Sequence, residues 1–184
     1  MAEMQVSPDS RVAEVPSFPV EHQWYAVQTR CRHEKKLLLH LGYSYVDSFL
    51  PLFSRLSCWS DRKQVIQEPL FPGYVFVHIA WTPATRNLVL MQPGAVALVG
   101  TRGVATPIPE KQIEDIKTLL ARSVECTYYP FLQNGDRVRV RGGALDGVEG
   151  ILVRRNQDES LVISVDAIQR SLSVRVTGYV LEKV

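Results

Sequence analysis

The sequence predicts an α+β protein in which an α/β domain is followed by a small all-β barrel. Two observations lead to this prediction. Between Trp24 and Arg122, β-branched and aromatic runs alternate with stretches of helical composition. From Asn134 onward the chain changes to short alternating runs that glycine interrupts, without a helical period. With 184 residues, 46% of them hydrophobic, the chain has enough material for two small packed cores.

The first half is predicted to hold strands and helices in alternation. The predicted strands span residues 24–29, 49–59, 63–67, 74–79 and 95–99, and the predicted helices span 32–41, 84–91 and 110–121. The stretch Ser60-Asp61-Arg62 predicts the turn of a hairpin. Gly42 stops the first helix, and the last is the clearest because its apolar residues fall on one face and Pro109 precedes its first turn.

The second half is predicted to form a small antiparallel barrel of five short strands. They span residues 138–141, 148–153, 161–165, 172–176 and 179–181. Their residues are largely β-branched, and glycine interrupts every candidate helix, so both helix and strand propensities favour a barrel. Four glycines between Gly135 and Gly150 suit the tight bends that connect such strands.

These patterns divide the chain into four parts. Residues 1–21 mix Pro, Ser, Asp and Glu without a sustained period, which predicts a mobile tail. The α/β domain is expected over 22–122 and the barrel over 134–184. The linker between them, 123–133, is too aperiodic for a regular element and too apolar to be free, so we expect it to lie partly against a surface.

Composition excludes several classes of protein. No apolar run approaches the roughly 20 residues of a membrane span, and the first residues carry acids instead of a signal-peptide core, so we expect a cytoplasmic protein without a membrane partner. The three cysteines are far apart and form no C-x-x-C pair. Residues 23–122 hold twelve bases and seven acids, a net charge of about +5, which permits contact with a polyanion without requiring it.

Nothing in the sequence predicts an enzyme, a cofactor or a metal site. His33 and His40 lie seven residues apart with Cys31 nearby, but no carboxylate pair or HExxH spacing completes a metal site there. The chain has no GxSxG, no P-loop and no G-x-G-x-x-G after a strand. We therefore expect a binding protein.

The stretch EPLFPGYVFVHI, residues 68–79, joins a buried-type strand to a Pro-Gly turn that carries a large apolar side chain, Phe71. An aromatic residue on a bend suggests a contact surface. Ordinary core packing is the alternative for this residue and for the other aromatic residues of the domain, most of all for Trp24.

Several motifs together resemble one family. The stretch GDRVRVRGGALDGVEG, 135–150, resembles the KOW motif. WYAVQT, FPGYVFV, QPGAVALVG and PIPEKQIEDI, in this order and spacing, resemble the N-terminal domain of the NusG family of transcription elongation factors. The likeness covers residues 24–184. It implies a NusG-type N-terminal α/β sandwich followed by an SH3-like KOW barrel, in a monomer without cofactors.

The resemblance also implies a function and its residues. Members of the family dock on the clamp of RNA polymerase with the N-terminal domain and recruit other factors with the barrel. The positions that match the aromatic depression for the polymerase helices are Trp24, Tyr25, Phe71 and Tyr74. Thr82, Thr85 and Arg86 match the region that approaches the opposite side of the polymerase cleft. Arg30, Arg32, Lys35 and Lys36 match an edge near upstream or non-template DNA, although a solvated helix face explains them equally well.

The barrel departs from the family at the stretch that contacts Rho or a ribosomal protein. Of that stretch only Arg170 and Val174 remain, and Ile168 stands in the aromatic place. Rho is therefore a doubtful partner, and the chain looks like a specialised paralogue of the RfaH or capsule-operon antiterminator kind. Two alternatives stay open. One is a general NusG acting in Rho-dependent termination, and the other is a KOW-type protein that binds RNA or the ribosome.

Overall fold

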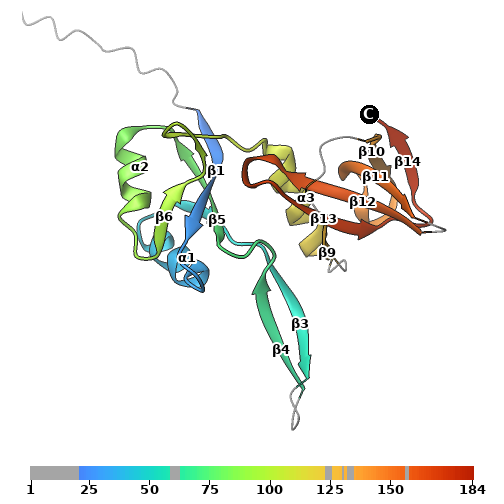
Figure 1. Ribbon diagram of the computed structural model, residues 1–184, viewed down its shortest axis with the longest axis horizontal. Coiled ribbons are helices and arrows are strands. Elements are labelled where there is room, and N and C mark those ends of the chain that lie inside the picture. Colours follow the sequence, from blue (N-terminus) through green and yellow to red (C-terminus); the bar gives the residue numbers. More distant parts are fainter. Residues whose placement is uncertain (1–20, 59–62, 123–125, 130, 132–134, 156–157) are drawn as a thin grey trace, which may run out of the picture.

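The computed structural model describes residues 21–58, 63–122, 126–129, 131, 135–155 and 158–184. An α/β domain occupies one side of the molecule and a strand-rich barrel the other, and a long hairpin projects between them (Figure 1). Apart from Glu21, the tail predicted for 1–21 lies outside the described residues, as does the predicted turn at Ser60-Asp61-Arg62. No helix of the described part is long and apolar enough to cross a bilayer.

The α/β domain is built on a four-stranded antiparallel sheet with the strand order β2-β5-β1-β6. Its strands are β1 (His22–Thr29), β2 (Asp47–Phe49), β5 (Tyr74–Ala80) and β6 (Ala95–Leu98). Its helices are α1 (Glu34–Tyr43), α2 (Pro83–Leu90) and α3 (Glu110–Ala121). The strands predicted around Trp24, Tyr74 and Ala95 and all three predicted helices are confirmed, with ends that shift by no more than two residues. Gly42 does not stop the first helix as predicted, because α1 continues through it to Tyr43.

The two faces of this sheet pack against different partners. Because side chains alternate along a strand, Trp24 and Ala26 of β1 point to one face while Tyr25 and Val27 point to the other. The Tyr25 face packs against α1 and α2, and the Trp24 face packs against α3. The sheet is thus a layer between helices, and its Trp24 face looks toward the barrel.

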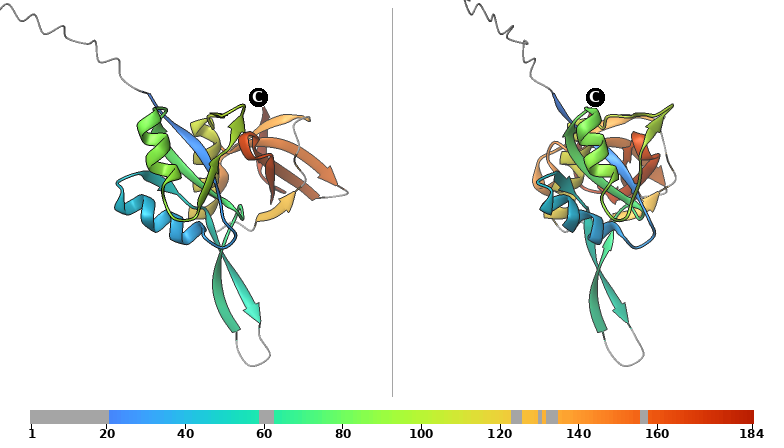
Figure 2. Two further views of the ribbon diagram at one scale, coloured as in Figure 1. Left: turned by 60° about the vertical axis from the view of Figure 1, so that its left-hand side comes forward. Right: turned by 90° about the vertical axis from the view of Figure 1, so that its left-hand side faces the viewer.

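Four short strands stand apart from this sheet. β3 (Leu52–Cys58) and β4 (Lys63–Pro69) pair along their whole length as the projecting hairpin, and Figure 2 shows it leaving the body of the molecule in two further views. β7 (Gly100–Thr101) and β8 (Val104–Ala105) form a small ribbon after β6. The predicted hairpin is therefore confirmed outside its tip.

The barrel is a six-stranded antiparallel sheet with the strand order β14-β10-β11-β12-β13-β9. Five of its strands are β10 (Arg137–Arg141), β11 (Glu149–Arg155), β12 (Asp158–Val165), β13 (Arg170–Arg175) and β14 (Val180–Lys183). They confirm the five predicted strands. The 3-10 helices η1 (Gly143–Leu145) and η2 (Asp166–Ile168) fill two of the connections. Inward-facing Val138, Val140, Leu161, Ile163 and Val174 form the barrel core.

The sixth strand, β9 (Cys126–Tyr129), corrects the prediction of a linker without regular structure. It pairs with β13 and covers that edge of the barrel sheet. A strand of four residues is too short to show an alternating pattern by itself, and it forms because β13 offers an unpaired edge. Cys126 packs against the cores of both domains, and burial raises the pKa of its thiol to about 11.

The turn that carries Phe71 is held by a carboxylate from α1. Gly73 has φ 87°, a conformation that favours glycine, and its N–H donates to Oε1 of Glu34 at 2.8 Å. Glu34 is buried, and the N–H of Thr29 adds a bond of 2.8 Å to the Gly73 carbonyl. A charged acceptor thus fixes the geometry of the Pro-Gly turn.

Removing this acceptor should destabilise the α/β domain. We expect Glu34→Ala to lower the free energy of unfolding by about 1–3 kcal/mol, because the partly buried Gly73 N–H loses its charged acceptor, and Glu34→Gln to restore part of the loss. Denaturant titration measures both. Glu114→Ala, an exposed glutamate on α3, is the control and should change stability by less than about 0.5 kcal/mol. Equal losses for Glu34→Ala and Glu114→Ala would contradict the role of Glu34.

Candidate functional site

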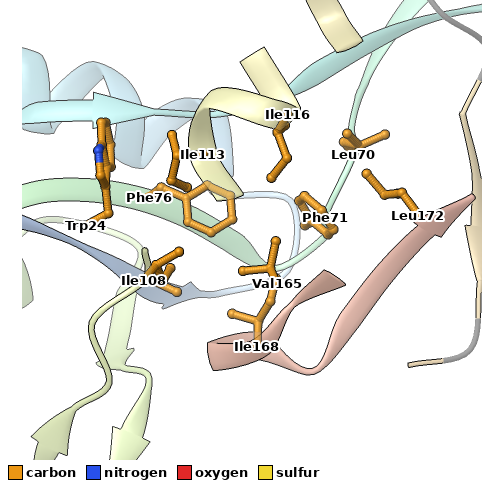
Figure 3. Close-up of a cluster of buried hydrophobic side chains, with 11 residues drawn as sticks. Trp24, Leu70, Phe71, Phe76, Ile108, Ile113, Ile116, Val165, Ile168 and Leu172 are labelled. Atoms are coloured by element: carbon orange, nitrogen blue, oxygen red, sulfur yellow. The ribbon is translucent and has the colours of Figure 1, made fainter. Parts of the chain in front are cut away.

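Phe71, the aromatic residue on the bend, is buried. It is 2% exposed and meets Phe76 of β5 edge to face, with ring centroids 5.9 Å apart. Figure 3 shows it in a cluster to which both domains contribute. We call this the shared cluster; its residues are Trp24, Ala26, Leu70, Phe71, Phe76, Ile108, Ile113, Ile116, Val165, Ile168 and Leu172.

Three residues of the shared cluster come from the barrel. Val165 ends β12, Ile168 ends η2 and Leu172 lies in β13, and all three face the α/β domain around Phe71, Leu70 and Ile116 (Figure 3). None of the three belongs to the core of the barrel itself. These barrel residues therefore close over the apolar surface of the α/β domain that holds Phe71, and we call this the closed arrangement.

Helix α3 lies between the two domains and contacts both. Ile113 and Ile116 belong to the shared cluster, whereas Leu119 belongs to the barrel core. The sequence predicted one apolar face for this helix. That face is wide enough to pack against both the sheet and the barrel. The periodicity of the helix could not show that the face has two partners.

Polar side chains of α3 border the shared cluster and bind the barrel. Lys111 Nζ donates to the Gly147 carbonyl at 2.7 Å, and Gln112 Nε2 donates to Asp166 Oδ2 at 3.0 Å. In return, the Asp166 N–H donates to Gln112 Oε1 at 3.4 Å. These bonds fix how the barrel sits on α3, because hydrogen bonds require defined directions where apolar packing does not.

Asp115 is the one carboxylate of α3 that the closed arrangement buries in the described part of the chain. It pairs with Lys111 and accepts the Glu149 N–H at 3.4 Å. Burial raises the pKa of Asp115 above its ordinary value, while the bond and charge of Lys111 oppose that rise. Desolvation thus raises the pKa of Asp115 more than its hydrogen-bonding partners lower it. The contact between α3 and the barrel therefore buries a carboxylate that water would solvate better.

The four aromatic residues predicted to line one open depression do not do so. Trp24, Tyr25 and Phe71 are buried, and Tyr74 is half-buried against the shared cluster. Tyr25 lies on the opposite face of the sheet, where its ring centroid is 5.0 Å from that of Trp81. The prediction failed for Tyr25 because adjacent residues of a strand point to opposite faces. The prediction also missed the burial of Phe71, because the sequence around Phe71 carries no sign that the barrel covers it.

Trp24 has polar neighbours that the sequence did not predict. His78 stacks on its ring at 4.9 Å between centroids, and Lys117 Nζ of α3 lies 4.8 Å from the ring centroid. A cation over an indole is favourable, so Lys117 helps to hold α3 on the sheet. The periodicity of α3 placed Lys117 on its polar face and carried no sign of this contact.

Thr82 and Thr85 have a structural role at the start of α2. Thr82 caps the helix by accepting the Thr85 N–H at 3.2 Å, and the Thr82 N–H donates to Thr85 Oγ1 at the same distance. Arg86 lies one residue further along, with its guanidinium carbon 5.0 Å from the ring centroid of Trp81. The structure therefore brings these three residues together on the far side of the domain from the shared cluster.

The four predicted DNA-facing bases are all exposed. Arg30 and Arg32 lie in the turn before α1 instead of on it, and Arg32 has φ 60°, which a helix cannot contain. Lys35 and Lys36 lie on α1, and Lys35 Nζ donates to the Gln67 carbonyl at 2.9 Å. Exposure agrees with both interpretations, a DNA contact and a solvated face.

The two predicted partner residues of the barrel behave differently. Arg170 is exposed at the start of β13, whereas Ile168 is 6% exposed and lies in the shared cluster. Gln169 between them takes the left-handed conformation, with φ 50°. In the closed arrangement, Ile168 is therefore buried in the same cluster as Phe71, with Val165 between the two side chains (Figure 3).

The described residues hold no group of three His, Cys, Asp or Glu side chains that would suit a metal ion. His33 Nδ1 lies 2.9 Å from the Cys31 carbonyl and so makes a bond within its own turn. His40 lies beside Tyr43, with ring centroids 6.4 Å apart. The two histidines thus have separate local partners.

Comparisons with known proteins agree on one family. The NusG family model, described as "Transcription termination factor nusG", matches residues 22–117. The protein named "Transcription termination/antitermination protein NusG" of Borreliella burgdorferi is 26% identical, over 88% of this chain and 98% of its own length. That of Lactococcus lactis is 29% identical, over 88% and 92%.

A solved structure shares the fold. "Domain interaction in Thermotoga maritima NusG" superposes with a TM-score of 0.53 at 21% identity, over 89% of this chain and 98% of that one. The two-domain geometry described above, the family match over more than half the chain and relatives that align over nearly their full length lead to one conclusion. The chain belongs to the NusG family and is a NusG-like transcription termination/antitermination factor.

Proposed function

We propose that this protein is a transcription elongation and antitermination factor that binds the clamp of RNA polymerase with the surface around Phe71 and Tyr74. The observation that carries the proposal is that the barrel completes the burial of Phe71, because Val165, Ile168 and Leu172 join residues of the α/β domain in the shared cluster. Where the barrel moves away, Leu70, Phe71 and Ile116 become an apolar surface next to the partly exposed Tyr74. Apolar and aromatic anchors of this kind dominate protein interfaces.

The proposal requires the domains to separate before the polymerase binds. Separation frees Ile168 and Leu172 of the barrel at the same time, since they bury the Phe71 surface in the closed arrangement. One movement therefore makes both the polymerase-binding surface and the recruiting surface of the barrel available. The buried Asp115 favours this movement, because its carboxylate regains water when the barrel leaves.

A KOW-type RNA-binding function is less well supported by the barrel surface. Arg139 pairs with Glu149, and Arg141 pairs with Glu182, so acids neutralise two of the arginines that RNA would contact. The barrel holds eight bases and seven acids over 134–184, a net charge of only about +1. Protein recruitment therefore fits the barrel better than phosphate binding.

Opening the domains should strengthen polymerase binding. Ile168→Asp places a charge in the shared cluster without touching the barrel core, so we expect apparent affinity for RNA polymerase to rise roughly tenfold or more as the closed arrangement loses population. Pull-down or interferometry with purified polymerase measures it. Val180→Asp, at an exposed position of β14, is the control and should leave affinity unchanged. Unchanged binding by Ile168→Asp would contradict masking by the barrel.

The role of Phe71 is best tested in the opened chain. In the Ile168→Asp background, Phe71→Ala should weaken polymerase binding by about 1–3 kcal/mol, because an apolar anchor is removed. In the wild-type background the same change also loosens the closed arrangement, so its net effect should be smaller. If Phe71→Ala leaves binding intact in the opened chain, Phe71 serves only the contact between the domains.

The specialised-antiterminator assignment rests on the barrel stretch around Ile168 and Arg170. Family members that assist Rho carry an aromatic residue and a Thr-Pro turn there, and this chain has neither. We therefore propose that the protein raises readthrough at pauses and terminators and does not assist Rho. A ribosomal protein remains a candidate partner of the barrel, and upstream or non-template DNA a candidate partner of Arg30, Arg32, Lys35 and Lys36.

Transcription in vitro with and without Rho separates the two kinds of factor. We expect the protein to increase full-length transcript in the absence of Rho, by a few-fold at a pause-rich template, and to leave Rho-dependent termination unenhanced. The Ile168→Asp chain should increase readthrough further, since more of it is open. Enhanced termination on adding Rho would instead identify a general NusG.

A further inference from the structure

A hollow opens at the end of the α/β domain away from the barrel. It lies between α2, β6 and the β7–β8 ribbon, with a volume of about 190 Å³. In Figure 1 these elements are at the opposite end of the molecule from β10–β14, and in the right-hand view of Figure 2 α2 faces the viewer with the barrel behind it. The hollow therefore remains open in the closed arrangement.

Apart from Arg86, the side chains that line the hollow are apolar or small, and polar atoms supply the smaller share of its exposed wall. Leu90, Val96, Leu98 and Val104 line it together with small residues, and Arg86 is the one charged residue among its described lining. Val96 is 53% exposed and Val104 is 61% exposed, so the apolar surface continues around the mouth. A single cation beside apolar side chains favours a ligand that carries one negative charge.

Arg86 has no acidic partner in the described part of the chain. Its guanidinium lies over Trp81, and Trp81 is itself packed against Tyr25. Within the described residues the side chain of Arg86 makes no ion pair or hydrogen bond, and its Nε is closed to solvent without an acceptor. A buried donor without an acceptor is unfavourable, so a carboxylate that accepts from the guanidinium in its place over Trp81 would form a charge-assisted hydrogen bond.

The size and chemistry of the hollow select among anions. Cofactors and drug-sized ligands occupy pockets of roughly 300–1,000 Å³, which exceeds this hollow. A phosphate monoester carries a charge of about −1.5 to −2 at pH 7, and the one guanidinium of the hollow compensates only part of it. A carboxylate matches one guanidinium, and the apolar walls and mouth suit apolar residues on either side of it.

We infer that this hollow receives an aspartate or glutamate side chain, flanked by apolar residues, from a segment of a protein partner. Arg86 binds the carboxylate, Trp81 holds the guanidinium in place, and Val96 and Val104 contact the flanking residues. The inference rests on the proposed function only in that the polymerase is the partner that carries the segment. Because the hollow is open in the closed arrangement, this contact precedes separation of the domains.

A peptide titration of the full chain tests the inference without polymerase. The probes are acetyl-Val-Glu-Leu-amide and its glutamine analogue, and the readout is the NMR shift of the Trp81 indole N–H. We expect saturable binding of the glutamate peptide, at least about tenfold tighter than that of the glutamine peptide. Equal affinities of the wild-type chain for the two peptides would overturn the inference.

Variants then locate the site. Arg86→Gln should abolish the preference for glutamate, and Arg86→Lys, which keeps the charge, should retain part of it. Arg102→Gln, which removes an exposed arginine of the β7–β8 turn outside the hollow, is the matched control and should retain all of it. A preference that survives Arg86→Gln would refute the assignment. Failure of the proposed function would appear separately, as peptide selectivity without polymerase binding.

Discussion

The structure depends on one apolar contact, the burial of Phe71 between its own sheet and the barrel. Phe71 is among the largest fully buried side chains of the described part, although it lies on a turn between a projecting hairpin and a strand. Val165, Ile168 and Leu172 supply the cover, and the barrel core does not include them. The contact therefore links the two domains through barrel residues outside the barrel's own core cluster, which suits the proposed separation of the domains.

Helix α3 makes this contact specific. Its isoleucines extend the shared cluster, and Lys111 and Gln112 fix the orientation of the barrel through hydrogen bonds to Gly147 and Asp166. Asp115 works against the closed arrangement, because burial disfavours its carboxylate. A mostly apolar contact that also desolvates one carboxylate is consistent with the proposed separation of the domains.

The sequence predicted the elements well and the relation between the domains poorly. Strong local patterns, such as the periodicity of α3 and the glycine-broken runs of the barrel, specified helices and strands almost to their ends. The FPGY turn was correctly singled out, but the exposure of Phe71 depends on residues almost a hundred positions away. β9 was missed because it exists only through its pairing with β13. Tyr25 was grouped with Trp24 by motif, although the alternation of a strand separates them.

The central claim is that the same movement uncovers both Phe71 and Ile168. Hydroxyl-radical footprinting of the chain, alone and with RNA polymerase, tests it directly, because side-chain oxidation reports solvent exposure. The account predicts that on binding Ile168 and Leu172 become reactive, Phe71 stays protected beneath the polymerase, and exposed Val180 of β14 does not change. Continued protection of Ile168 and Leu172 in the polymerase complex would contradict the account.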